Sequence, residues 1–94
     1  MKRGRVYLSG AISLNSESAK AEFAYAERIC LSRGYEVFNP ITDDKMEYHE
    51  YLRLDLAELL KCTHICYVND TTTSKGAFLE KILADACKIK EIKL

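Results

Sequence analysis

Two carboxylate residues lie on faces of predicted helices that should otherwise be apolar. Asp55 comes three residues after Leu52 and four before Leu59, inside an apolar stripe. Glu80 comes four residues after Gly76, on a face whose small residues suit close packing against a sheet. A buried ionised carboxylate costs several kcal/mol unless it has a partner. We therefore expect each carboxylate to meet a partner or a ligand.

Two carboxyl groups that face one cleft can cleave a glycosidic bond. One attacks the anomeric carbon while the other, as an acid, assists the leaving group. Tyr7, at the end of a predicted strand, would hydrogen-bond the attacking carboxylate if its side chain points to the same side of the sheet. Simpler interpretations stay open: Asp55 can pair with Arg53 or a nearby tyrosine, Glu80 can extend to solvent between helices, and Tyr7 can be a core aromatic residue.

Alternating strands and helices must position these residues. Short apolar runs bounded by turn residues predict strands at residues 6–8, 35–38, 64–68 and 89–94. Helical periodicity predicts helices from about residue 18 to Gly34, over 48–61 and over 76–88. The stripe of the first helix is Ala19, Phe23, Ala26 and Cys30. The inner stripe of the second is Tyr48, Leu52, Leu56, Leu59 and Leu60.

This alternation predicts right-handed crossovers and a parallel sheet with helices on both faces. We expect an α/β fold, a four-stranded Rossmann-like or flavodoxin-like three-layer sandwich, formed by one domain over residues 1–94. Such sheets bind ligands beyond the carboxyl ends of their strands. The residues expected to bind substrate there are Ser9, Gly10, Ala11, Ile12, Asn39, Pro40, Ser74 and Gly76.

The composition is that of a soluble globular protein. Of 94 residues, 48% are hydrophobic and 30% charged, with a formal net charge of +0, which argues against disorder and against a nucleic-acid polymer as partner. The N-terminal apolar run is too short for a signal peptide or membrane span, so we expect a cytoplasmic protein without a membrane partner.

Neither a metal nor a cofactor is expected. The four cysteines form no CxxC pair and the two histidines lack ligand spacing, so reduced core thiols are favoured. A four-stranded sheet has two open edges, and a chain of this size gains stability by burying more apolar surface against a second copy. We therefore predict a homodimer or a larger homo-oligomer.

Several short motifs together resemble one enzyme family. They are Tyr7-Leu8-Ser9-Gly10-Ala11-Ile12, Asn39-Pro40, Asp55-Leu56 and Ser74-x-Gly76-x-x-x-Glu80. In this order they resemble the nucleoside 2-deoxyribosyltransferase superfamily, whose small members include the 2'-deoxynucleoside 5'-monophosphate N-hydrolases and many short bacterial and phage proteins. The resemblance covers nearly the whole chain.

The resemblance implies a role for each matching residue. Glu80 would be the nucleophile that captures the deoxyribosyl group, Asp55 would bind or protonate near the sugar and base, and Tyr7 would hydrogen-bond the nucleophile. The first loop, residues 10–13, would lie beside the ligand, and Ser74 would contact the sugar or its phosphate. Ala11 and Ser13 replace a serine and an arginine of the monophosphate hydrolases, which removes the main charge partner of a 5'-phosphate.

Three hypotheses of function follow. The first is an enzyme that acts on the N-glycosidic bond of a nucleoside or nucleotide derivative, by deoxyribosyl transfer or by hydrolysis. The second is a non-catalytic nucleoside- or nucleotide-binding module of the same fold. The third is a structural or interaction domain, in which protein partners neutralise Asp55 and Glu80.

Overall fold

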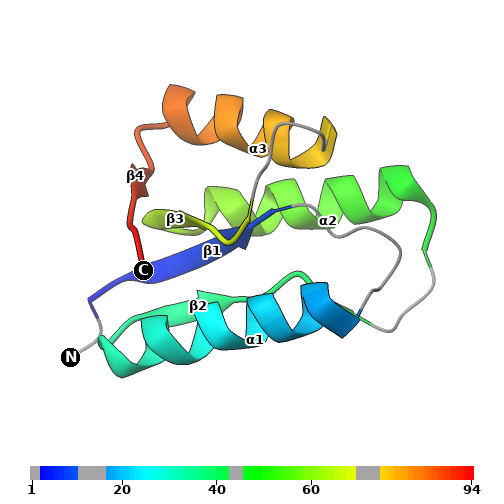
Figure 1. Cartoon of the computed structure of the whole chain (residues 1–94). Helices are drawn as coiled ribbons and strands as arrows, with labels where there is room; N and C mark the ends of the chain where they lie inside the picture. Colours follow the sequence, from blue (N-terminus) through cyan, green and yellow to red (C-terminus); the bar gives the residue numbers. More distant parts are fainter. Residues whose placement is uncertain (1–2, 11–16, 43–45, 70–74) are drawn as a thin grey trace.

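The chain alternates strands and helices in the predicted order (Figure 1). A computed structural model describes residues 3–10, 17–42, 46–69 and 75–94. The elements are β1 (Arg5–Ser9), α1 (Glu17–Ser32), β2 (Glu36–Phe38), α2 (Tyr48–Leu60), β3 (His64–Tyr67), α3 (Lys75–Ala86) and β4 (Lys90–Glu91). This order confirms the predicted α/β class.

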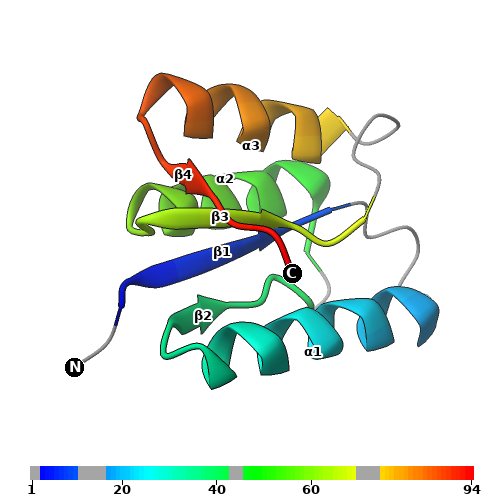
Figure 2. The ribbon, with the colours of Figure 1, turned by 60° about the vertical axis from the view of Figure 1, so that its left-hand side comes forward.

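The four strands form one parallel sheet in the order β2-β1-β3-β4. The central strand β1 pairs with β2 and β3, so that Tyr7 lies beside Phe38 on one side and Ile65 on the other. Helices α2 and α3 cover one face of the sheet and α1 covers the other (Figure 2). The predicted three-layer sandwich is therefore confirmed.

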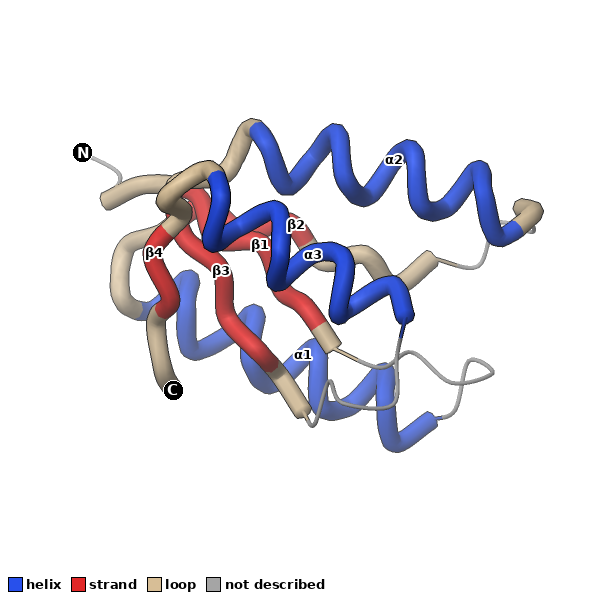
Figure 3. The backbone as a smooth tube through the Cα atoms, turned by 90° about the horizontal axis from the view of Figure 1, so that it is seen from above, coloured by secondary structure: helices blue, strands red, loops and turns tan. Residues whose placement is uncertain are grey.

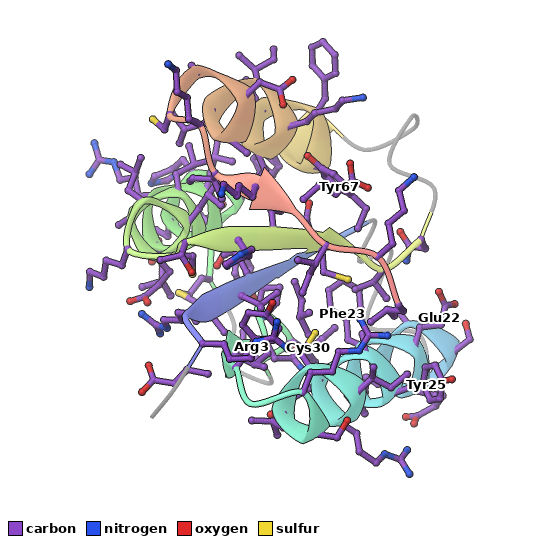
Figure 4. The ribbon with its side chains drawn as sticks, turned by 90° about the vertical axis from the view of Figure 1, so that its left-hand side faces the viewer. Arg3, Glu22, Phe23, Tyr25, Cys30 and Tyr67 are labelled. Carbon is purple, nitrogen blue, oxygen red and sulfur yellow. The ribbon has the colours of Figure 1, made fainter. Side chains whose placement is uncertain are left out.

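The first core lies between the sheet and α1. Val6 and Leu8 alternate onto this face of β1 and pack with Phe23, Ala26 and Cys30. Phe23 and Cys30 point from α1 toward the sheet, while Tyr25 points away from it (Figure 4). The stripe predicted for the first helix is thus the buried one, and full burial of a side chain such as Phe23 contributes about 1.5–3 kcal/mol.

The second core lies between the sheet and the pair α2 and α3. Tyr7, the intervening residue of β1, packs there with Leu59 of α2, Ile65 of β3 and Ala84 of α3. The two-residue period of β1 therefore sends Tyr7 to the side of the sheet opposite to α1. The Glu80 side chain lies on this same side of the sheet, where it accepts a hydrogen bond from the Tyr7 hydroxyl.

Helix α2 departs from its predicted stripe at two residues. Leu59 is buried, but Tyr48 and Leu60 are mostly exposed. Leu60 follows Leu59 by about 100° around the helix, which turns it away from the sheet. Tyr48 starts a helix whose first turns extend past the ends of the strands (Figure 3), so no sheet lies beneath it.

The last helix and strand are shorter than predicted. Helix α3 ends at Ala86 instead of residue 88, because Lys88 adopts a left-handed φ of 57° that ends the helix. Strand β4 covers two residues, although the Ile92 amide still donates a 2.9 Å hydrogen bond to the Ile65 carbonyl. Within the described ranges, no helix has both the length and the apolar content that crossing a bilayer requires.

Gly4 allows the chain to enter β1 close to Thr63. Its φ is +133°, and a Cβ atom there would lie 2.4 Å from Thr63 Oγ1. That same oxygen accepts a 3.0 Å hydrogen bond from the Arg5 amide. A side chain at position 4 would therefore meet both backbone strain and a clash.

Candidate active site at the Glu80 carboxylate

Glu80 lies on the face of α3 that packs against the sheet. Ala77, Glu80 and Ala84 follow the spacing of one helical face, and all three are buried. The two alanines let the helix approach the sheet closely. Only 7% of Glu80 is exposed, so its charge depends on partners from the protein.

Two hydroxyl groups of β1 supply those partners. The Tyr7 hydroxyl donates to Glu80 Oε2 and the Ser9 hydroxyl donates to Glu80 Oε1, each at 2.7 Å. Tyr7 and Ser9 are two residues apart on one strand, so both side chains reach the same face of the sheet. Each oxygen of Glu80 therefore has its own donor, which suits an ionised carboxylate because that form only accepts hydrogen bonds.

Burial and hydrogen bonding act in opposite directions on the Glu80 carboxyl. Burial raises its pKa and outweighs the hydrogen bonds from Ser9 and Tyr7, which lower it, so the pKa of this carboxyl lies above its ordinary value. The pKa of Tyr7 is raised, first by burial and then by the charge of Glu80. Tyr7 therefore stays a neutral phenol and can serve only as a hydrogen-bond donor to the ionised carboxylate.

Packing fixes the orientation of the Tyr7 ring. The ring stacks on Phe38 of β2, with centroids 5.4 Å apart and planes 19° from parallel. The Arg5 guanidinium lies 5.8 Å from the Phe38 ring centroid. The ring that bears the hydroxyl bonded to Glu80 is thus held by stacking between residues of the neighbouring strands β1 and β2.

Asp55 is the second carboxyl group of the site. It is half-buried on α2, and burial, the charge of Glu80 and then that of Glu58 raise its pKa to about 7. Glu58 pairs with Arg5 at 3.0 Å and Lys61 at 3.4 Å. Among the described residues, none forms an ion pair or hydrogen bond with Asp55, so the pairing with Arg53 considered above is absent.

The two carboxyl groups differ in the way that acid and base roles require. Glu80 has two hydroxyl donors that favour its ionised form, whereas Asp55 has burial and like charges that favour its protonated form. The pKa values of both carboxyl groups are raised, but only Glu80 has hydroxyl donors that stabilise its ionised form. A glycosidic cleavage site requires a difference of this kind between its two carboxyl groups.

Ser9 contacts Glu80 directly. The sequence predicts it as a substrate-binding residue, and in the structure its side chain is fully buried and its hydroxyl donates to Glu80. Its spacing of two residues from Tyr7 was the signal that would have grouped it with Tyr7 as a partner of Glu80. Ser9 therefore belongs to the support of Glu80.

The side chain of Asn39 is turned toward α1, on the other face of the sheet from Glu80. Its Nδ2 donates to Glu27 Oε1 at 2.9 Å, and its Oδ1 accepts from the Ile41 amide at 3.0 Å. Pro40 beside it is buried. The structure therefore does not bring the Asn39 side chain to the carboxylate pair, Asp55 and Glu80.

The remaining predicted binding residues flank β1 and α3. Gly10 follows β1, and a Cβ atom there would lie 2.6 Å from Asn69 Oδ1 and 3.2 Å from Phe23 Cζ. Gly76 lies in the first turn of α3, one turn before Glu80. Ala11, Ile12 and Ser74 lie outside the described residues. In the part of the chain that the structure describes, no three His, Cys, Asp or Glu side chains gather in a way that could hold a metal ion.

One family model matches this chain over residues 4–93. The family is described as a domain of unknown function (DUF4406), and the chain belongs to it. No curated protein matches the chain. An activity is therefore inferred from the chemistry of Glu80 and Asp55.

Proposed function

We propose that this protein is an enzyme that cleaves the N-glycosidic bond of a nucleoside or nucleotide derivative, with Glu80 as nucleophile. The observation that carries the proposal is the buried Glu80 carboxylate, held by the hydroxyls of Tyr7 and Ser9 and accompanied by Asp55, whose pKa is raised to about 7. A carboxylate that accepts two hydrogen bonds, close to a carboxyl group whose pKa is raised, is suited to displacement at an anomeric carbon.

In the first step, one oxygen of Glu80 attacks C1' of the sugar and forms a glycosyl ester. The bond between C1' and the base nitrogen breaks, and its electron pair goes to the base. Asp55 donates its proton to the departing base, which leaves neutral. Tyr7 and Ser9 keep the Glu80 carboxylate in one orientation during the attack, so that little conformational freedom is lost at the transition state.

In the second step, the ester is resolved. Asp55, now ionised, removes a proton from water or from the nitrogen of a second base, and that atom attacks C1'. The bond between C1' and Glu80 breaks and the carboxylate is restored. Water yields the free sugar and a second base yields a new nucleoside, so hydrolysis and transfer share one intermediate.

The substrate class follows from the resemblance to the nucleoside 2-deoxyribosyltransferase superfamily. The motifs that carry this resemblance include Tyr7 and the two carboxylate residues, Asp55 and Glu80. A nucleoside derivative also suits a small parallel sheet, in which ligands bind beyond the carboxyl ends of the strands. We therefore propose a small-molecule nucleoside or nucleotide as ligand.

The test is release of free base from a panel of deoxynucleosides, ribonucleosides and their 5'-monophosphates. Wild-type protein should release base from at least one of them, and Glu80→Ala should abolish the release. Glu27→Ala, which removes a glutamate on the α1 side of the sheet, serves as the matched control and should retain activity. Equal release by wild type and Glu80→Ala would show that Glu80 is not the nucleophile.

The same panel distinguishes an enzyme from a binding module. A binding module would be stabilised against heat by one of these ligands without releasing base, because a ligand at about 100 times its dissociation constant adds about 2.7 kcal/mol. Stabilisation of the Glu80→Ala variant without turnover, together with turnover by wild type, would support the enzyme. Stabilisation without turnover in both proteins would support the binding module.

A further inference from the structure

Helix α3 carries apolar side chains on the face opposite to Glu80. Phe78, Leu79 and Ile82 are 59%, 41% and 50% exposed. Their spacing places them on one face of the helix, away from the buried Ala77 and Ala84. Helix α3 lies with α2 in the outer layer on this side of the sheet, and no described element covers the outward face of α3 (Figure 1). An exposed cluster of this kind marks an interaction surface.

The sheet edges are poor alternatives for association. The edge strands β2 and β4 have three and two residues, too few to template a new strand pair. Both residues of β4, Lys90 and Glu91, are charged and exposed. Short charged edges are a common protection against edge-to-edge pairing. The apolar face of α3 has no such protection among its three large side chains.

Two charges beside the apolar face indicate what covers it. Lys81 and Asp85 are exposed, lie four residues apart and therefore share one flank of α3. In the described part of the chain, neither forms an ion pair. When two copies of a helix pack antiparallel about a two-fold axis, identical flanks face each other. Lys81 of each copy then lies opposite Asp85 of the other, so this flank is complementary to itself.

We propose that two copies of this chain associate through their α3 helices, packed antiparallel about a two-fold axis midway between Lys81 and Asp85. Ile82 of each copy lies beside this axis, and Phe78 and Leu79 lie about one turn away, against the C-terminal end of the partner's helix, with Phe78 as the aromatic anchor. Two equivalent pairs of Lys81 and Asp85 lie at the rim. Glu80 faces the sheet on the opposite side of the same helix, so this interface is independent of the proposed activity.

The first test measures the mass of the protein by sedimentation equilibrium over a range of concentrations. Wild type should be a dimer, and Ile82→Lys should be a monomer. Leu31→Lys is the matched control, because Leu31 is also 50% exposed but lies on α1, and it should stay dimeric. Circular dichroism confirms that each variant is folded. A monomeric wild type, or a dimer that survives Ile82→Lys, would overturn the proposal.

The second test exchanges charges without changing the apolar centre. Lys81→Glu and Asp85→Lys should each weaken the dimer about tenfold, because each places like charges opposite each other twice in a two-fold dimer. The double variant K81E/D85K restores opposite charges, and its dissociation constant should return to about that of wild type. If the double variant is weaker than both single variants, the antiparallel arrangement is wrong.

Discussion

The Tyr7 hydroxyl and the Glu80 carboxylate are joined by a 2.7 Å hydrogen bond across 73 residues of sequence. The bond joins the central strand of the sheet to α3, two regular elements that hold their side chains more precisely than loops do. Ser9 repeats the connection from the same strand to the other oxygen of Glu80. The orientation of Glu80 is therefore set by the sheet.

Tyr7→Phe should lower the free energy of unfolding by about 1–3 kcal/mol, the usual cost of leaving a buried acceptor without its donor. The substitution keeps the ring and its stacking on Phe38. It should also raise the pKa of Glu80, because it removes a hydrogen bond that lowers this pKa in the wild-type protein. Urea denaturation at neutral pH measures the stability.

Tyr25→Phe is the control for this change, since Tyr25 is an exposed tyrosine on α1. Its free energy of unfolding should stay within about 0.5 kcal/mol of wild type. Equal losses in the two variants would mean that the bond between Tyr7 and Glu80 contributes nothing specific.

Ser9→Ala should lower kcat by about tenfold to a hundredfold and leave KM unchanged, provided that the proposed activity is found. The fully buried Ser9 acts by holding Glu80, and small displacements of a reacting group carry penalties of that order. Steady-state kinetics on the active substrate provide the measurement. Ser32→Ala, which removes an exposed hydroxyl bonded to the Ile29 carbonyl, should change neither constant. A raised KM with unchanged kcat would instead make Ser9 a substrate contact.

Asp55→Asn should remove a pH dependence of stability. The pKa of Asp55 is raised from 3.8 to about 7, so the folded state binds this proton more tightly than the unfolded state. The stabilisation is complete below about pH 4 and is lost as the pH rises through about 7. The full shift corresponds to about 4 kcal/mol, and solvent screening of this half-buried group reduces the expected effect to about 1–2 kcal/mol.

Urea denaturation between pH 4 and 8 measures this difference. Relative to wild type, Asp55→Asn should gain stability steadily as the pH rises, while Glu22→Gln, an exposed control on α1, should follow wild type. Parallel curves for Asp55→Asn and wild type would show that the Asp55 proton is not held more tightly in the folded state.

In the activity assay, the decline of wild-type rate above about pH 7 should be absent from Asp55→Asn, whose remaining rate should be low throughout.

Gly4→Ala should destabilise the fold more than Gly34→Ala. Both glycines have positive φ, at +133° and +92°, so alanine is strained at either position by about 1–3 kcal/mol. A Cβ atom at position 34 would meet only ordinary contacts at 3.5 Å, whereas one at position 4 would lie 2.4 Å from Thr63 Oγ1. Thermal denaturation of the two variants gives the order. A larger loss for Gly34→Ala would show that the contact with Thr63 relaxes without cost.

Local pattern was sufficient to predict the elements and part of the site. The stripe of Ala19, Phe23, Ala26 and Cys30 predicted the buried face of α1, because helical periodicity is a property of a short segment. The unusual positions of Asp55 and Glu80 were visible for the same reason. The exposure of Leu60 was missed, since an apolar residue in a helix does not reveal how far the covering layer extends.

The sequence by itself determined the α/β class and the order of the elements, and it predicted Tyr7, Asp55 and Glu80 as candidates for chemistry. These follow from periods of two and 3.6 residues and from residue type. Only the tertiary structure decided that Ser9 joins Tyr7 on Glu80, that Asn39 turns toward α1, and that burial and the charge of Glu80 raise the pKa of Asp55. Such contacts join segments far apart in the chain, and strand order and helix placement set them.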